Sequence, residues 1–193
     1  MKNRIIPNTL ACRKLRKQHG NALIPYIIGL LISAILAASG IYAYQYVNQA
    51  KADADIQELS SLRAATVKLG ANQGGNFSSI DTATVAGLSF FNANRVSGSG
   101  ATTSVMNQWK GTISVAPASI ASASSNDALA FTYTGVPTDA CKEVVQSAAQ
   151  IAAVISIGGT TVKSNGGTLS VANMITQCNA GADNTSIVYT MSR

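Results

Sequence analysis

The chain has 193 residues and a formal net charge of +6, and charged residues make up only 11% of it, below the roughly 25% of an average globular protein. Residues 1–20 contain six of the fourteen Lys and Arg residues and no acid, so the remaining eight basic residues balance the eight acidic residues. This distribution disfavours a basic face on the body of the protein, and we predict no nucleic-acid binding by the head itself. After residue 20 there is no His and there are two Cys, which removes Ser-His-Asp and Cys-His catalysis and the common zinc ligand sets. We predict neither an enzyme nor a metal or other cofactor.

The segment that follows the basic residues has the composition of a membrane span. It is uncharged from residue 21 to residue 50 and nearly all apolar from Ala22 to Tyr44. A helix of about 20 such residues crosses a bilayer core, and the positive charge before it keeps the N-terminus in the cytoplasm. We therefore predict a helix that contacts membrane lipid over residues 21–47, with a cytoplasmic leader over residues 1–20 and an extracytoplasmic head.

An ordinary cleaved secretory signal is the alternative interpretation of this segment. It fits less well, because the apolar run is longer than the roughly 7–15 residues of a signal-peptide core. The small residues Ala37, Ala38, Ser39 and Ala43 keep a cleavage site of that kind open.

Helical periodicity continues beyond the apolar run. Apolar positions and one threonine recur at steps of three and four residues at Ile56, Leu59, Leu62, Thr66 and Leu69. Because no loop signal separates the two parts and glycine commonly ends a helix, we predict one helix over residues 21–69 that stops at Gly70. Its second half should pack against the head.

The charged residues of this second half have no catalytic pattern. They are Lys51, Asp53, Asp55, Glu58 and Arg63. We expect them to form a solvated helix face or pairs between subunits.

The rest of the chain divides by composition into a connecting region rich in Gly, Ser and Asn over residues 70–108 and a head over residues 109–193. Alternating or β-branched residues predict strands at 111–116, 128–134, 155–162 (with a turn at its two glycines) and 186–191, and helical spacing predicts a second helix at 138–152. The predicted fold class is α+β, with a long N-terminal helix packed on an antiparallel sheet. The lone Trp109, beside a strand, is predicted to belong to the sheet core.

Several of these segments together resemble the type IV pilins, and in particular the type IVb group. The basic leader ends in Gly20 directly before the apolar helix, as at a prepilin peptidase site, and the leader is as long as type IVb leaders tend to be. Further likenesses are Leu23-Ile24, Ala37-Ala38, the segment 107–111, and the segments 134–141 and 175–181 around the two cysteines.

The resemblance implies cleavage between Gly20 and Asn21 and a disulfide between Cys141 and Cys178. The disulfide also fits an even pair of cysteines in an outward-facing domain. An assembly helix would use Leu23, Ile24, Pro25, Gly29, Ala37, Ala38 and Gly40, since small residues let apolar helices approach closely.

One position departs from the family pattern. Type IV pilins usually have a glutamate as the fifth mature residue, which is thought to pair with the N-terminal amine of a neighbouring subunit. Here that position is Pro25. This departure favours a minor or tip subunit that needs a partner pilin as one alternative.

The resemblance thus implies a structural subunit of a type IVb-like pilus. Its partners would be other copies or other pilins, prepilin peptidase and the inner-membrane assembly machinery. It would reside in the inner membrane before assembly and in the cell-surface pilus afterwards. The alternative from a different class is a single-pass membrane-anchored binding module that never polymerises.

Overall fold

The computed structural model describes residues 23–120 and 125–193, without the side chains of residues 23–25, 40, 41 and 44. Helix α1 (Leu23–Asn72) is 50 residues long. The contacts between residues divide the whole chain into two units, Met1–Tyr44 and Gln45–Arg193, and α1 runs from the first into the second. The predicted cleavage site at Gly20 and Asn21 lies outside the described residues.

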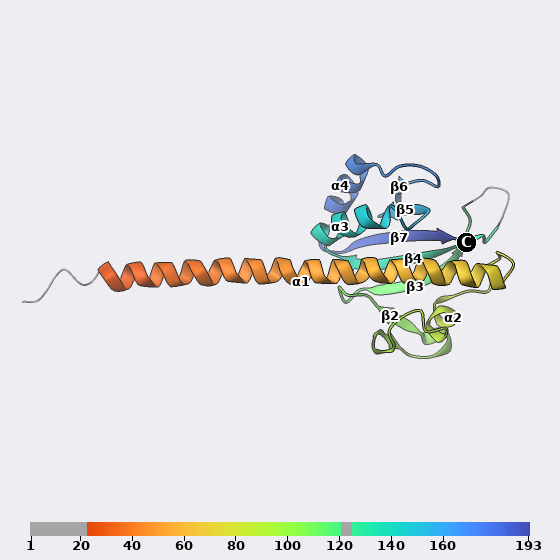
Figure 1. Cartoon of the computed structure of the whole chain (residues 1–193), viewed down its shortest axis with the longest axis horizontal. Helices are drawn as coiled ribbons and strands as arrows, with labels where there is room; N and C mark the ends of the chain where they lie inside the picture. Colours follow the sequence, from red (N-terminus) through yellow and green to blue (C-terminus); the bar gives the residue numbers. More distant parts are fainter. Residues whose placement is uncertain (1–22, 121–124) are drawn as a thin grey trace, which may run out of the picture. The chain divides into compact units, whose positions relative to one another are not determined.

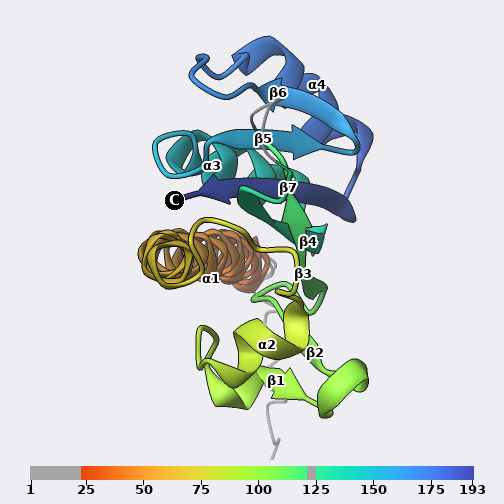
Figure 2. The same ribbon diagram turned by 90° about the vertical axis from the view of Figure 1, so that its right-hand side faces the viewer.

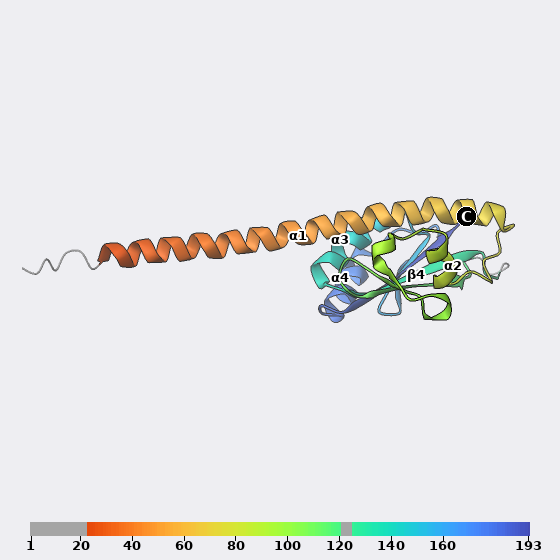
Figure 3. The ribbon, with the colours of Figure 1, turned by 90° about the horizontal axis from the view of Figure 1, so that it is seen from below.

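In the second unit, α1 lies along one face of a β-sheet (Figures 2 and 3). The predicted stripe forms the contact: Leu59, Leu62 and Thr66 are fully buried, and Ile56 and Leu69 are partly buried against the same core. The three- and four-residue spacing of these positions places them on one face of the helix, so this half of α1 is stabilised mainly by packing.

The predicted end of this helix at Gly70 is wrong, because α1 continues to Asn72. Gly70 instead lies where the helix contacts other parts of the head, and a Cβ atom there would come within 3.0 Å of both the Phe77 ring and the Arg193 side chain. The chain leaves the helix at Gly74 and Gly75, whose φ angles are positive (63° and 83°), a conformation that glycine adopts without strain.

The sheet has seven strands in the order β1-β2-β3-β4-β7-β5-β6, and every pairing is antiparallel. Its strands are β1 (Val96–Ser97), β2 (Ser104–Met106), β3 (Thr112–Ala118), β4 (Ala128–Val136), β5 (Val154–Ile157), β6 (Thr160–Lys163) and β7 (Thr185–Ser192). The central strands alternate buried and half-buried side chains, as β4 does with Leu129, Phe131 and Tyr133 buried. Figure 1 shows α1, α3 and α4 with these strands, and the predicted α+β class with its antiparallel sheet is confirmed.

The remaining elements flank the sheet: those before β3 lie towards its β1 end, the last helix lies towards its β6 end, and the helix between β4 and β5 packs against β7 (Figure 2). They are α2 (Thr82–Gly87), the 3-10 turns η1 (Ala93–Arg95) and η2 (Gly100–Thr102), α3 (Thr138–Ala148) and α4 (Val171–Ala180). The second predicted helix is confirmed as α3, four residues shorter than expected. The predicted strand 155–162 is the hairpin β5–β6, which turns at Gly158 and Gly159 as expected. Helix α4 was not predicted.

Among the residues whose positions are described, no helix is long and apolar enough to cross a membrane. The predicted span over residues 21–47 is therefore not supported by the structure.

Candidate functional site

The first unit presents an apolar helix surface that no described residue of the unit covers. From residue 26 to residue 39 every side chain is exposed. The large apolar residues among them are Tyr26, Ile27, Ile28, Leu30, Leu31, Ile32, Ile35 and Leu36, with exposed fractions of 50–75%. A contiguous apolar surface of this kind marks a site of association.

The residues predicted for assembly all belong to this part of α1. Gly29, Ala37 and Ala38 are exposed on the helix, and a Cβ atom at Gly29 would meet nothing within 4 Å. Pro25 is the third helical residue, so it lies in the first turn, where a missing N–H removes no intrahelical bond. The helix therefore accommodates Pro25 in place of the family's glutamate.

The predicted disulfide is present in the head. Cys141 of α3 and Cys178 of α4 are bonded, with a Cα–Cα distance of 5.8 Å, and both are fully buried. The hydroxyl group of Thr138 at the start of α3 donates to the carbonyl of Ala182, just beyond α4, at 2.7 Å. This bond and the disulfide hold α4 to α3, and α4 also packs directly on β5 and β6.

On the other side of the head, Glu58 of α1 is the centre of a buried polar cluster. Its carboxylate forms an ion pair with Arg95 of η1 and accepts a hydrogen bond from the hydroxyl group of Tyr133 on β4 at 2.7 Å. Arg95 also donates through Nε to the carbonyl of Met106 on β2. One carboxylate thus joins the long helix, the sheet and the segment between η1 and β2.

Asp55 is the second acid of this cluster and is more deeply buried, with 1% of its surface exposed. Its Oδ2 accepts a hydrogen bond from the indole N–H of Trp109 at 2.7 Å, whereas Oδ1 has no partner among the described residues. Burial raises the pKa of Asp55 to about 6, against the opposing effects of the Trp109 bond and of Arg95. Protonation of this carboxyl group therefore takes place in the mildly acidic range.

A tight turn over residues 107–111 holds Trp109 against Asp55. The side-chain oxygen of Asn107 accepts from the backbone N–H groups of Trp109 (2.9 Å) and Gly111 (2.8 Å), and its Nδ2 donates to the carbonyl of Thr134 at 2.6 Å. A Cβ atom at Gly111 would collide with that same carbonyl, so the close approach of this turn to β4 requires glycine there. Trp109 packs against the core as predicted.

The prediction that the charged residues of α1 form a solvated face or intersubunit pairs is wrong for three of them. Asp55 and Glu58 point into the head, and Arg63 donates to the carbonyl of Ile151 at 2.9 Å. Spacing could have revealed this, because Asp55 lies four residues before Leu59, on the buried stripe, and Glu58 lies next to it. Arg95, in the connecting region, carried no signal of its own.

The head also exposes a few large apolar side chains. Val171 and Ile175 lie one turn apart on α4, and Leu88 contributes with Phe90 to a shallow groove beside α1 of about 300 Å³. Within residues 23–120 and 125–193 no group of His, Cys, Asp and Glu side chains could hold a metal ion.

Comparisons with known proteins agree with this arrangement. Residues 49–192 match the family model described as PilS N terminal, whereas no curated protein matches the chain. The fold is similar to that of a type IVb pilin from Salmonella typhi (18% identity, TM-score 0.57, 73% of this chain and 99% of that chain covered). It is also similar to TcpA, a type IV pilin from the El Tor biotype of Vibrio cholerae (18% identity, TM-score 0.51, 75% and 99% covered).

Proposed function

Because this chain belongs to the PilS N-terminal family and is a type IVb pilin-like structural protein, we propose that it is cut after Gly20 and assembles into a pilus through the first half of α1. The observation that carries this proposal is the helix surface over residues 26–39, on which every side chain is exposed and most are apolar. Such a surface is unstable in water and is stabilised by a bundle of like helices.

The assembly is a head-to-tail one. Contacts between unlike surfaces that do not close into a ring generate a helical filament, with apolar helices inside and heads outside. The small residues Gly29, Ala37 and Ala38 allow close approach of neighbouring helices. An inner-membrane stage before assembly, with the peptidase and the assembly machinery as partners, stays a prediction that rests on the uncharged residues 21–50 and the basic residues before them.

The cleavage is tested by the intact mass of the protein from the cell envelope. We expect a mature chain that begins at Asn21. Replacing Gly20 by Leu should leave residues 1–20 attached and prevent assembly, and Gly29→Leu, which leaves the cleavage site unchanged, is the matched control for processing. A wild-type species that retains Met1, or one cut near Ala43, would contradict the proposal.

A second candidate is a minor or tip subunit that depends on another pilin, and Pro25 is the observation that favours it. A freed N-terminal amine carried into an apolar bundle is costly unless it is paired, and proline supplies no carboxylate. Expression with the assembly machinery but without other pilins should then give few filaments, and Pro25→Glu should increase their number. Abundant filaments of the wild-type chain alone would instead identify a self-assembling subunit.

A further inference from the structure

The surroundings of Asp55 disfavour an ionised carboxyl group. The side chain is almost completely buried, one oxygen has a single donor, and the other has no partner among the described residues. Arg95 forms its ion pair with Glu58, the other acid of the cluster. A buried carboxylate with one hydrogen bond beside another acid is costly, whereas the neutral carboxyl group is not.

The other titratable and charged groups near Asp55 and Trp109 come from the sheet, from α1 and from η1. On the sheet side, burial holds the pKa of Tyr133 and of Tyr189 well above the ordinary tyrosine value, so both are neutral. From α1 come Glu58, which is bonded to Arg95, and Lys51, whose ammonium lies 5.2 Å from the centre of the Trp109 ring. Arg95 is positive throughout.

The segment that supplies Trp109 pairs with the rest of the sheet through a short ladder. The 93–111 segment consists of η1, β1, η2, β2 and the Asn107 turn. Its β2 strand pairs with β3 through two residue pairs, Val105 with Ile113 and Met106 with Thr112. A segment with so short a ladder opens locally at lower cost than the central strands, and Trp109 and Arg95 are its polar contacts with Asp55 and Glu58 of α1.

We propose that Asp55 is a proton-operated latch for the 93–111 segment. With a proton bound, the carboxyl group is neutral and still accepts the Trp109 N–H, so the segment stays closed over it. When the proton is lost, the buried carboxylate is stabilised if water reaches it. Water reaches it when the segment opens. The head therefore tightens this edge in mild acid and loosens it at neutral and alkaline pH.

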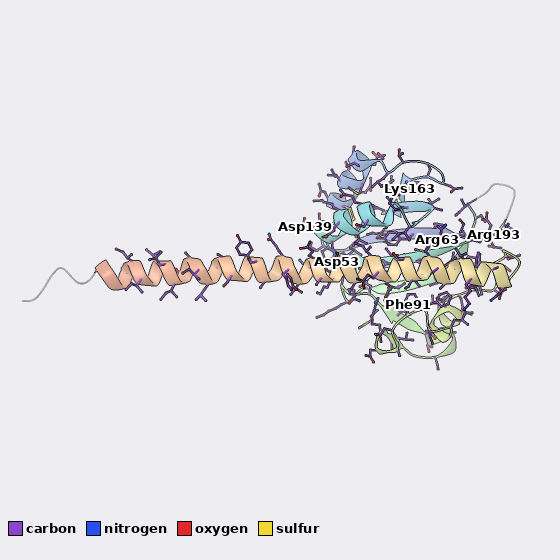
Figure 4. All side chains as sticks on the ribbon, viewed as in Figure 1. Asp53, Arg63, Phe91, Asp139, Lys163 and Arg193 are labelled. Atoms are coloured by element: carbon purple, nitrogen blue, oxygen red, sulfur yellow. A yellow bond between two sulfur atoms is a disulfide. The ribbon has the colours of Figure 1, made fainter. Side chains whose placement is uncertain are left out.

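Trp109 is the only tryptophan of the chain, so its fluorescence reports directly on this contact. With the full-length protein in detergent micelles, we expect the emission to titrate in one step with a midpoint near pH 6. Asp55→Asn keeps an oxygen acceptor without a titrating proton and should abolish the step. Asp53→Asn removes the same charge from an exposed position on the same helix (Figure 4) and should leave the step unchanged.

Hydrogen–deuterium exchange then tests the opening itself. After correction for intrinsic rates, amides of the 93–111 segment should exchange about tenfold more slowly at pH 5 than at pH 7 in the wild type and in Asp53→Asn. They should show no such difference in Asp55→Asn. Emission that is flat from pH 5 to pH 8, a step that survives Asp55→Asn, or equal protection at both pH values would overturn the proposal. If Asp55→Asn does not fold, the comparison of amide exchange at pH 5 and pH 7 in the wild type and in Asp53→Asn decides whether the segment opens with pH.

Discussion

The two edges of the head are fastened to its centre in different ways. At the β6 edge, helix α4 is tied to α3 by the buried bond between Cys141 and Cys178. At the β1 edge, the 93–111 segment is tied to α1 by two carboxylates and their partners. A covalent bond is indifferent to pH and responds to reductant, whereas a polar cluster responds to pH and to the loss of any one partner. The attachment at the β6 edge should therefore be independent of pH, whereas the attachment at the β1 edge should depend on it.

The largest expected effect is loss of the covalent tie. Replacing both Cys141 and Cys178 by Ser should lower the free energy of unfolding of the head by about 4 kcal/mol, because the bond closes a loop of 37 residues. Urea unfolding without reductant, monitored by the fluorescence of Trp109, measures this change in the free energy of unfolding. A variant as stable as the wild type would show that α4 is held by packing alone.

The next effect is loss of the cation at the polar edge. Arg95→Met should cost about 2–3 kcal/mol, because it leaves the mostly buried carboxylate of Glu58 without its counter-ion. Lys142→Met is the matched control: it removes the same kind of charge from a pair with Asp139, which is 95% exposed, and should cost less than about 1 kcal/mol. Equal losses in the two variants would contradict a special role for the buried pair.

A smaller effect should appear when pH alone is changed. Asp55 binds its proton more tightly in the folded than in the unfolded state, since its pKa rises from 3.8 to about 6. Its contribution to stability is complete below the unfolded value and is lost as the pH rises through about 6. The wild type should therefore be about 1 kcal/mol more stable at pH 5 than at pH 7 relative to Asp55→Asn. Denaturation at both pH values measures the difference, and a wild type that loses stability towards pH 5 relative to the variant would contradict it.

The smallest effect concerns Lys51, whose ammonium lies over the Trp109 ring. Lys51→Met should cost about 0.5 kcal/mol, the value of an exposed cation–π contact, and should leave the disulfide edge unchanged. Chemical denaturation of this variant, with amide exchange read separately at each edge, tests the assignment. Slower exchange at the 93–111 segment would contradict it.

The fold could be predicted where periodicity was long. The stripe from Ile56 to Leu69 and the strands that became β3, β4 and β7 followed from spacing and residue type, because the buried face decides both. Helix α4 was missed because it is only ten residues long and polar in places. The end of α1 was misplaced because tertiary contacts at Gly70 override the tendency of glycine to end a helix.

The candidate site was predictable only in part. The cysteine pair and the apolar surface were visible in composition, but the polar cluster joins residues far apart in the chain, such as Glu58 with Tyr133. No local pattern specifies such a contact. For Asp55, the one signal in the sequence is its position within the apolar stripe of the helix, which predicts that its carboxyl group is buried.

The place of β7 links completion of the head to the order in which the chain is synthesised. Residues 185–192 follow every other strand, yet they form the strand between β4 and β5. Until they emerge, the β5–β6 hairpin has no neighbour in the sheet and β4 has an open edge, although both cysteines are already available to pair. A nascent head interrupted before residue 185 exposes unpaired strand edges, which attract proteases and chaperones. An incomplete head would therefore differ from a complete one by the exposed edges of β4 and β5.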